Sequence, residues 1–177
     1  MLKKIFLGLV GLILIFCIIV AFQPAAYRIV RTNKIAAPPA AVFAQVNDFH
    51  NWDAWSPWAK LDPNMKVAYE GPAAGTGAIY KWVGNDKVGE GRMTILENKP
   101  GELVRIKLDF LKPFADTSTT EFTFKPDGDQ TAVSWSMAGD RNFMAKAVCM
   151  FMNMDKMVGG DFEMGLAQLK STTEAKK

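Results

Sequence analysis

An unbroken apolar run near the N-terminus is the strongest feature of the hydrophobic pattern. It extends from Ile5 to Phe22 without a charged side chain and follows a short positive segment that contains Lys3 and Lys4. As an α-helix the run is about 27 Å long, close to the hydrocarbon thickness of a bilayer. No polar face interrupts it, which argues against a helix buried in a soluble core. The run predicts a transmembrane helix over 5–22, within a membrane anchor that comprises residues 1–26.

A cleavable signal peptide begins in the same way and is the main alternative. Its apolar core is normally about 7–15 residues long and ends at a small-x-small cleavage site. Here the run is longer, and the residues around Pro24 and Ala26 match such a site poorly. Basic residues flank the run on both sides, so their distribution does not set its orientation. Because anchors of this form resemble export signals, we expect a single-pass membrane protein whose soluble domain lies on the non-cytoplasmic side.

Beyond the anchor, alternating apolar and polar positions predict seven strands. The first covers 27–36 and is stopped by Pro38 and Pro39, and two short helical segments are then expected over 40–46 and 47–58. Short connections predict antiparallel pairing of consecutive strands. Gly, Pro, Asn and Asp residues separate the remaining six strands, which are predicted over 65–70, 77–83, 88–98, 102–111, 117–125 and 130–138.

From Phe143 the apolar positions recur every three or four residues, which predicts a long amphipathic C-terminal helix followed by a polar tail over 170–177. The apolar stripe of this helix can be buried only against the sheet. We therefore expect an α+β domain over residues 27–177, in which a curved seven-stranded antiparallel sheet wraps around the long helix.

The predicted inner face of the sheet is rich in aromatic residues and methionine. Methionines also cluster between 144 and 164, and their flexible thioethers form adaptable walls for ligands. Gly89 and Gly91 on the same face are expected to leave space. These features favour a cavity, and close packing of the same side chains as a solid core is the alternative. The candidate cavity-lining residues are Trp52, Trp55, Tyr80, Trp82, Met93, Ile106, Phe110, Phe122, Trp135, Met137, Met154, Val158 and Phe162.

Several segments resemble a known family. They are residues 35–43 at the entry to the first short helix, the spaced tryptophans of 47–58, and the segments 75–78, 91–95 and 131–137. Together with the element order, they resemble the helix-grip fold of the START-related superfamily, in particular its polyketide cyclase/dehydrase and lipid-transport branch (SRPBCC). The resemblance implies an apolar cavity between sheet and helix that suits lipids, polyketides or other hydrophobic molecules. The family has no universal catalytic motif, so the resemblance assigns no catalytic residue.

The charge balance and the small number of histidines and cysteines limit which partners and which catalytic or metal-binding chemistry can be expected. The chain has 21 Lys and Arg against 18 Asp and Glu, so without the two anchor lysines the domain is nearly neutral and a nucleic-acid partner is not expected. His50 is the only histidine, and Cys17 and Cys149 stand alone. No metal site, cofactor or disulfide framework is therefore predicted. His50 is expected to be a solvated or capping side chain, with general-base catalysis as the alternative. The acidic residues expected on the solvated face of the C-terminal helix are Asp155, Asp161 and Glu163.

The leading functional hypothesis is a membrane-tethered domain that binds a hydrophobic small molecule or lipid in this cavity without chemistry. One alternative is a cyclase- or dehydrase-like enzyme that acts in the same cavity, which would require a carboxylate or an arginine in its lining. A further alternative is a protein-interaction module with a solid core.

Overall fold

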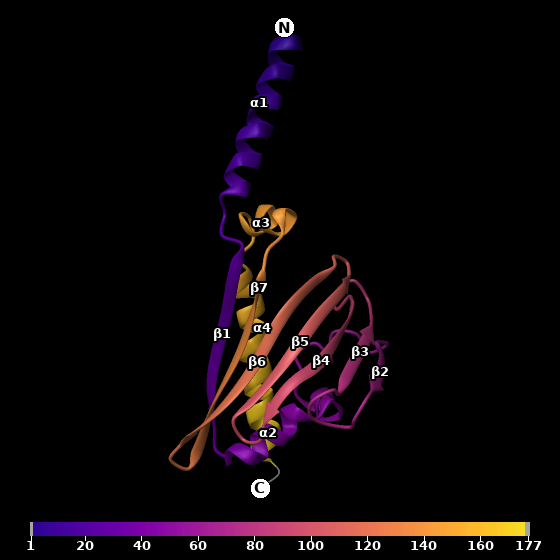
Figure 1. Ribbon diagram of the computed structural model, residues 1–177, viewed down its shortest axis with the longest axis vertical. Coiled ribbons are helices and arrows are strands. Elements are labelled where there is room, and N and C mark those ends of the chain that lie inside the picture. The colour runs from indigo at the N-terminus through magenta and orange to yellow at the C-terminus, as the bar shows by residue number, and fades with distance from the viewer. Residues whose placement is uncertain (1, 176–177) are drawn as a thin grey trace.

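A long N-terminal helix precedes an α+β domain in the computed structural model, which describes residues 2–175 (Figure 1). Helix α1 covers Leu2–Ala21, and most of its side chains are exposed. The strands are β1 (Ala26–Ile35), β2 (Lys66–Glu70), β3 (Ile79–Val83), β4 (Glu90–Lys99), β5 (Leu103–Lys112), β6 (Asp116–Asp127) and β7 (Gln130–Asp140). The other helices are α2 (Pro39–Asn47), the short 3₁₀ helix η1 (Phe49–Ala54), α3 (Phe143–Cys149) and α4 (Met154–Glu174).

The strands form one seven-stranded sheet in the order β1-β7-β6-β5-β4-β3-β2, and every neighbouring pair is antiparallel. Helix α4 lies along one face of the curved sheet (Figure 1). The predicted helix-grip fold is therefore confirmed, with two short helices after the first strand and the long helix near the C-terminus.

Antiparallel pairing gathers several connections at the end of the sheet where α1 enters. Ala26, at the start of β1, pairs with Asp140 at the end of β7. The β5–β6 and β3–β4 connections lie at this same end, because β5 and β3 run towards it while β6 and β4 run away from it. Figure 1 shows α1 and α3 beyond this end and the last turns of α4 at the opposite end.

The core lies between α4 and the concave face of the sheet. The α4 residues Phe162, Leu166 and Leu169 are fully buried. The ring of Trp135 on β7 stacks on Phe162, with 4.1 Å between ring centroids, and on Phe122 of β6, at 4.7 Å. Burying each such side chain contributes about 1.5–3 kcal/mol, so this cluster fixes how α4 is seated on the sheet.

Two tryptophans of the segment 47–58, Trp52 and Trp55, donate hydrogen bonds to backbone carbonyls of α2. Trp52 Nε1 donates to the Val46 carbonyl at 2.9 Å, and Trp55 Nε1 donates to the Gln45 carbonyl at 3.2 Å. Both indoles are buried, and their polar edges are therefore satisfied inside the core. Helix α2 begins at Pro39, where the fixed φ of proline suits the first helical turn.

The C-terminal helical region differs from the prediction in two ways. It is divided into α3 and α4, because Asn153 starts a new helix by accepting a hydrogen bond from the Lys156 backbone N–H at 2.9 Å. Helix α4 also continues to Glu174, so the predicted tail from Lys170 is wrong up to that residue. Glu174 accepts a hydrogen bond from the Ala36 backbone N–H at 2.6 Å, which fastens the last turn to the end of β1. Residues 176–177 lie outside the described chain.

Candidate ligand pocket

A cavity of about 210 Å³ lies between the sheet, the η1 segment and the first half of α4. Aromatic, aliphatic and methionine side chains form most of its wall, and a few polar side chains interrupt it. The lining residues are Trp52, Asp53, Ser56, Trp58, Ala59, Met65, Tyr80, Trp82, Lys87, Val88, Met93, Leu108, Phe110, Thr120, Trp135, Met137, Val158, Asp161 and Phe162.

The structure brings most of the predicted site residues to this cavity. Trp55, Ile106 and Phe122 instead lie in the solid core beside it and are fully buried. Met154 lies at the first turn of α4, outside the lining. The predicted residues that do line the cavity are Trp52, Tyr80, Trp82, Met93, Phe110, Trp135, Met137, Val158 and Phe162.

The methionine cluster near the C-terminus does not form the cavity wall. Met144, Met157 and Met164 have exposed side chains, on the outer faces of α3 and α4. The thioethers in the wall come instead from strands and loops, namely Met65, Met93 and Met137. The sequence-based expectation was wrong because the apolar period of α4 does not distinguish its sheet-facing stripe from nearby exposed methionines.

The space above Gly91 is filled by an aromatic side chain of the cavity wall and is not empty. The Trp82 indole lies directly over it, so a Cβ at position 91 would be 2.6 Å from the ring. Trp82 Nε1 donates to the Val88 carbonyl at 2.9 Å, which holds the ring in this position. Gly89 has a φ of +65° in the turn before β4, a conformation that favours glycine. The prediction that these two glycines leave space on the inner face is therefore wrong.

Polar side chains reach the cavity from two sides. Asp161 lines it from α4, and Asp53 lines it from η1. The expectation that Asp161 lies on the solvated face of α4 is wrong, because it is three residues from Val158 and next to Phe162, on the inward face of the helix. Burial raises the pKa of the Asp161 carboxyl above its ordinary value. Burial also raises the pKa of Tyr80 to about 12, so this phenol is neutral in the wall.

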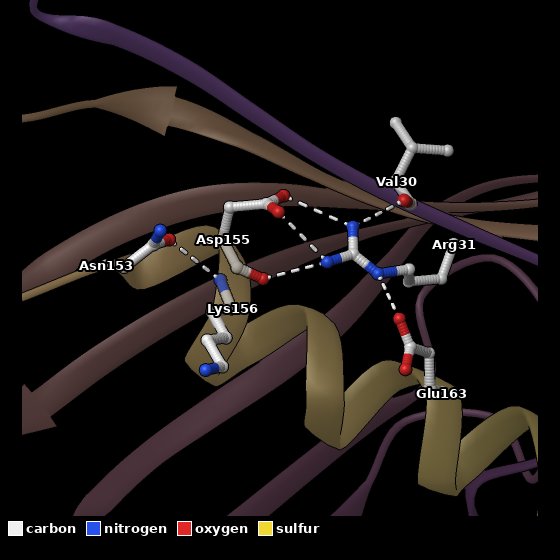
Figure 2. Close-up of polar contacts among 6 residues, drawn as sticks. All are labelled: Val30, Arg31, Asn153, Asp155, Lys156 and Glu163. Atoms are coloured by element: carbon white, nitrogen blue, oxygen red, sulfur yellow. Dashed lines mark hydrogen bonds and ion pairs between the residues drawn. The ribbon is translucent and has the colours of Figure 1, made fainter.

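A guanidinium clamp holds the first half of α4 on β1. Arg31 Nε donates to Glu163 at 2.6 Å, and its two terminal nitrogens donate to the Asp155 carboxylate at 3.0 and 3.2 Å and to the Asp155 and Val30 carbonyls at 3.0 and 2.9 Å (Figure 2). The guanidinium lies against Gly159, where any Cβ would collide with it. Asp155 and Glu163 thus do occupy the solvated face of α4, as expected, and there they pair with Arg31.

This clamp positions the helical wall of the cavity. Val158, Asp161 and Phe162 lie between Asp155 and Glu163 in the chain, so fixing both acidic residues on β1 fixes the segment that faces the cavity. Hydrogen bonds from Arg31 hold the pKa of the Asp155 carboxyl below its usual value. Sequence reasoning missed the clamp, because its partners are 124 and 132 residues apart.

His50 lies outside the cavity lining. Its ring stacks on Tyr69 at 4.0 Å, and its Nδ1 is 2.8 Å from Asp48 Oδ1. Asp48 also accepts from the His50 backbone N–H, so the pair caps η1. Over residues 2–175, no group of three or more His, Cys, Asp and Glu side chains is arranged to hold a metal ion.

A curved antiparallel sheet that holds a long helix, with an apolar cavity between them, defines a helix-grip protein with an internal pocket. Residues 27–174 match the family described as polyketide cyclase / dehydrase and lipid transport, and the chain belongs to this family. The family's description includes lipid transport, which is consistent with the largely apolar wall of the cavity.

Solved structures share this fold at low sequence identity. SA2116 from Staphylococcus aureus is similar with a TM-score of 0.65 and 9% identity, covering 87% of this chain and 97% of that protein. MLL2253 from Mesorhizobium loti has a TM-score of 0.62 and 15% identity over 85% and 99% of the two chains. CV1439 from Chromobacterium violaceum has a TM-score of 0.59 and 18% identity over 86% and 99%. No curated protein matches the sequence at a significant level.

Proposed function

We propose that the protein binds a hydrophobic small molecule or lipid in the cavity between α4 and the sheet, without converting it. The cavity wall carries this proposal, since aromatic rings and thioethers surround the space and few polar groups reach it. Its volume of about 210 Å³ suits a compact ligand or part of one acyl chain. Larger ligands would require the thioethers of Met65, Met93 and Met137 to change rotamer, which unbranched side chains do readily.

We further propose that α1 tethers this binding domain to a membrane, with residues 1–26 as the anchor and residues 27–177 as the domain. Helix α1 is long and apolar enough to cross a bilayer, and 6% of its most apolar window is buried against the rest of the protein. Such a surface is stable only in an apolar surrounding. The tether would keep the cavity beside the bilayer in which hydrophobic ligands concentrate, and we place the domain on the non-cytoplasmic side.

One observation favours an enzyme as a second candidate. Asp161 places a carboxyl with a raised pKa in the cavity wall. Such a group acts as a general acid or base in a cyclase- or dehydrase-like reaction. We favour binding without chemistry, because aromatic, aliphatic and methionine side chains form most of the cavity wall and few polar groups interrupt it.

The test is native mass spectrometry of the full-length protein after gentle extraction from its own membrane. We expect a bound molecule of lipid-like mass on the wild type. Val158→Trp fills the cavity with an indole and should remove that mass. Val67→Trp, which adds the same ring to an exposed position on β2, should retain it.

Two outcomes would contradict the binding proposal. They are a wild-type protein that never carries a bound mass, and a mass that Val158→Trp leaves unchanged. Asp161→Asn separates the two candidates. A binder keeps the same bound mass in this variant, whereas an enzyme would accumulate a different mass, that of its unconverted substrate.

A further inference from the structure

Exposed apolar side chains gather on α3 and the turn that follows it. Met144 is 67% exposed, and Phe151 is 80% exposed although its ring contacts Phe16 of α1. A patch of this kind on a soluble surface marks a site that another apolar surface covers. We define the α3 surface as Phe143, Met144, Val148, Met150, Phe151 and Met152.

This surface is continuous with the C-terminal end of α1. The rings of Phe16 and Phe151 stack, with centroids 6.3 Å apart and planes inclined by 27°. Lys146 Nζ donates to the Ala21 carbonyl, the last residue of α1, at 3.4 Å. Phe16 is about 7.5 Å along the helix axis from Ala21, given a rise of about 1.5 Å per residue. Because Phe151 contacts Phe16, it lies beside the last turns of α1, about 7.5 Å from the C-terminal end of that helix.

The charged side chains within the α3 segment itself are basic. Residues 141–153 contain Arg141 and Lys146 and no acidic side chain, while Asp116 and Asp140 lie at the adjoining ends of β6 and β7. A short apolar face with adjacent basic residues is typical of segments that lie in the interface of an anionic bilayer. A second copy of the same surface would bring like charges together, which favours the bilayer as the occupant.

We propose that the α3 surface inserts into the boundary between headgroups and acyl chains of the bilayer that α1 spans. This inference rests on the proposed tether. It gives the domain a second membrane contact and so restricts rotation about the connection between α1 and β1. The cavity residues Val88 and Phe110 belong to the end of the sheet from which α3 extends, so this orientation turns one side of the cavity towards lipid.

The test uses the full-length protein, one copy per nanodisc, in mixed phosphatidylcholine and phosphatidylglycerol. Cys17→Ser and Cys149→Ser remove the native thiols, and a polarity-sensitive fluorophore is attached at one new cysteine. Met144→Cys reports on the α3 surface, Leu12→Cys on α1, and Asp129→Cys on the β6–β7 turn at the opposite end of the sheet. Lipids that carry a spin label on the acyl chain serve as the quencher.

We expect the labels at positions 12 and 144 to lose most of their emission and the label at 129 to keep it. Quenching at 12 without quenching at 144 overturns the α3 proposal and leaves the tether intact. An unquenched label at 12 overturns the tether and this inference together. Val148→Cys is a second site on the same surface and replaces Met144→Cys if that variant does not fold.

Discussion

Gly165 is a point of close approach between α4 and the residues beneath it. It faces the Trp135 ring and Pro57, so a Cβ at this position would be 2.7 Å from the ring and 3.0 Å from the proline Cδ. The Trp135 ring cannot move away easily, because it stacks on the rings of Phe122 and Phe162. The absent side chain therefore lets the helix approach Trp135 and Pro57 closely.

Gly165→Ala should destabilise the protein, and Gly160→Ala should not. Overpacking at position 165 costs about 1–3 kcal/mol, which outweighs the gain of about 1 kcal/mol from replacing a helical glycine by alanine. At Gly160 nothing lies within 4 Å of a new Cβ, so only the gain applies. Denaturant unfolding of the full-length protein in mild detergent measures both variants. Equal stability of the two would show that the contact at position 165 is relieved by movement of the helix.

At the scale of elements, the Arg31 clamp is the main polar link between β1 and α4. Asp155 makes two of its hydrogen bonds through the carboxylate and a third through the backbone carbonyl. The pKa of the Asp155 carboxyl is lowered in the folded protein. The carboxylate therefore stabilises the fold fully at pH values above the ordinary Asp pKa of about 4. This stabilisation is lost as the pH falls through the lowered folded-state pKa.

Asp155→Asn should therefore lower the melting temperature at pH 7, and this difference should shrink as the pH falls below the ordinary carboxyl pKa. The measurement is the melting temperature of wild type and variant between about pH 7 and pH 2, a range that contains the ordinary carboxyl pKa and extends below it. Arg31→Met is the matched control, because Asp155→Asn should have a much smaller effect on that background. A difference that persists unchanged to the lowest pH would show that the carboxylate does not stabilise the clamp.

Strands were predictable from the sequence because their side-chain period is local, and turn residues mark their ends. The division between α3 and α4 was missed, since apolar positions continue through the turn and only Asn153 marks the new start. Cavity and core residues could not be separated along the chain. Trp52 lines the cavity while Trp55 is wholly inside the core, and their different roles depend on strands that approach from distant parts of the sequence.

For the whole molecule, the cavity and helix α1 are separate structural features. Residues 27–174 match the family and contain the complete cavity lining, whereas α1 contributes no lining residue. The cavity in the family's fold is thus complete without α1. Under the proposed function, α1 keeps the cavity close to the membrane. This location raises the rate at which the cavity encounters a ligand and leaves its affinity for the ligand unchanged.

Removal of residues 1–26 should therefore leave ligand affinity unchanged and slow the uptake of ligand from membranes. Isothermal titration with a soluble, short-chain ligand should give the same affinity for both forms, because the lining is intact. Transfer of a fluorescent lipid out of vesicles should be several-fold slower for the truncated protein, which must reach the bilayer by diffusion. A matched control carries α1 together with Val158→Trp, and it should remain on the vesicles without taking up lipid. Equal transfer rates with and without α1 would contradict the tether, while loss of affinity on truncation would show that α1 supports the pocket itself.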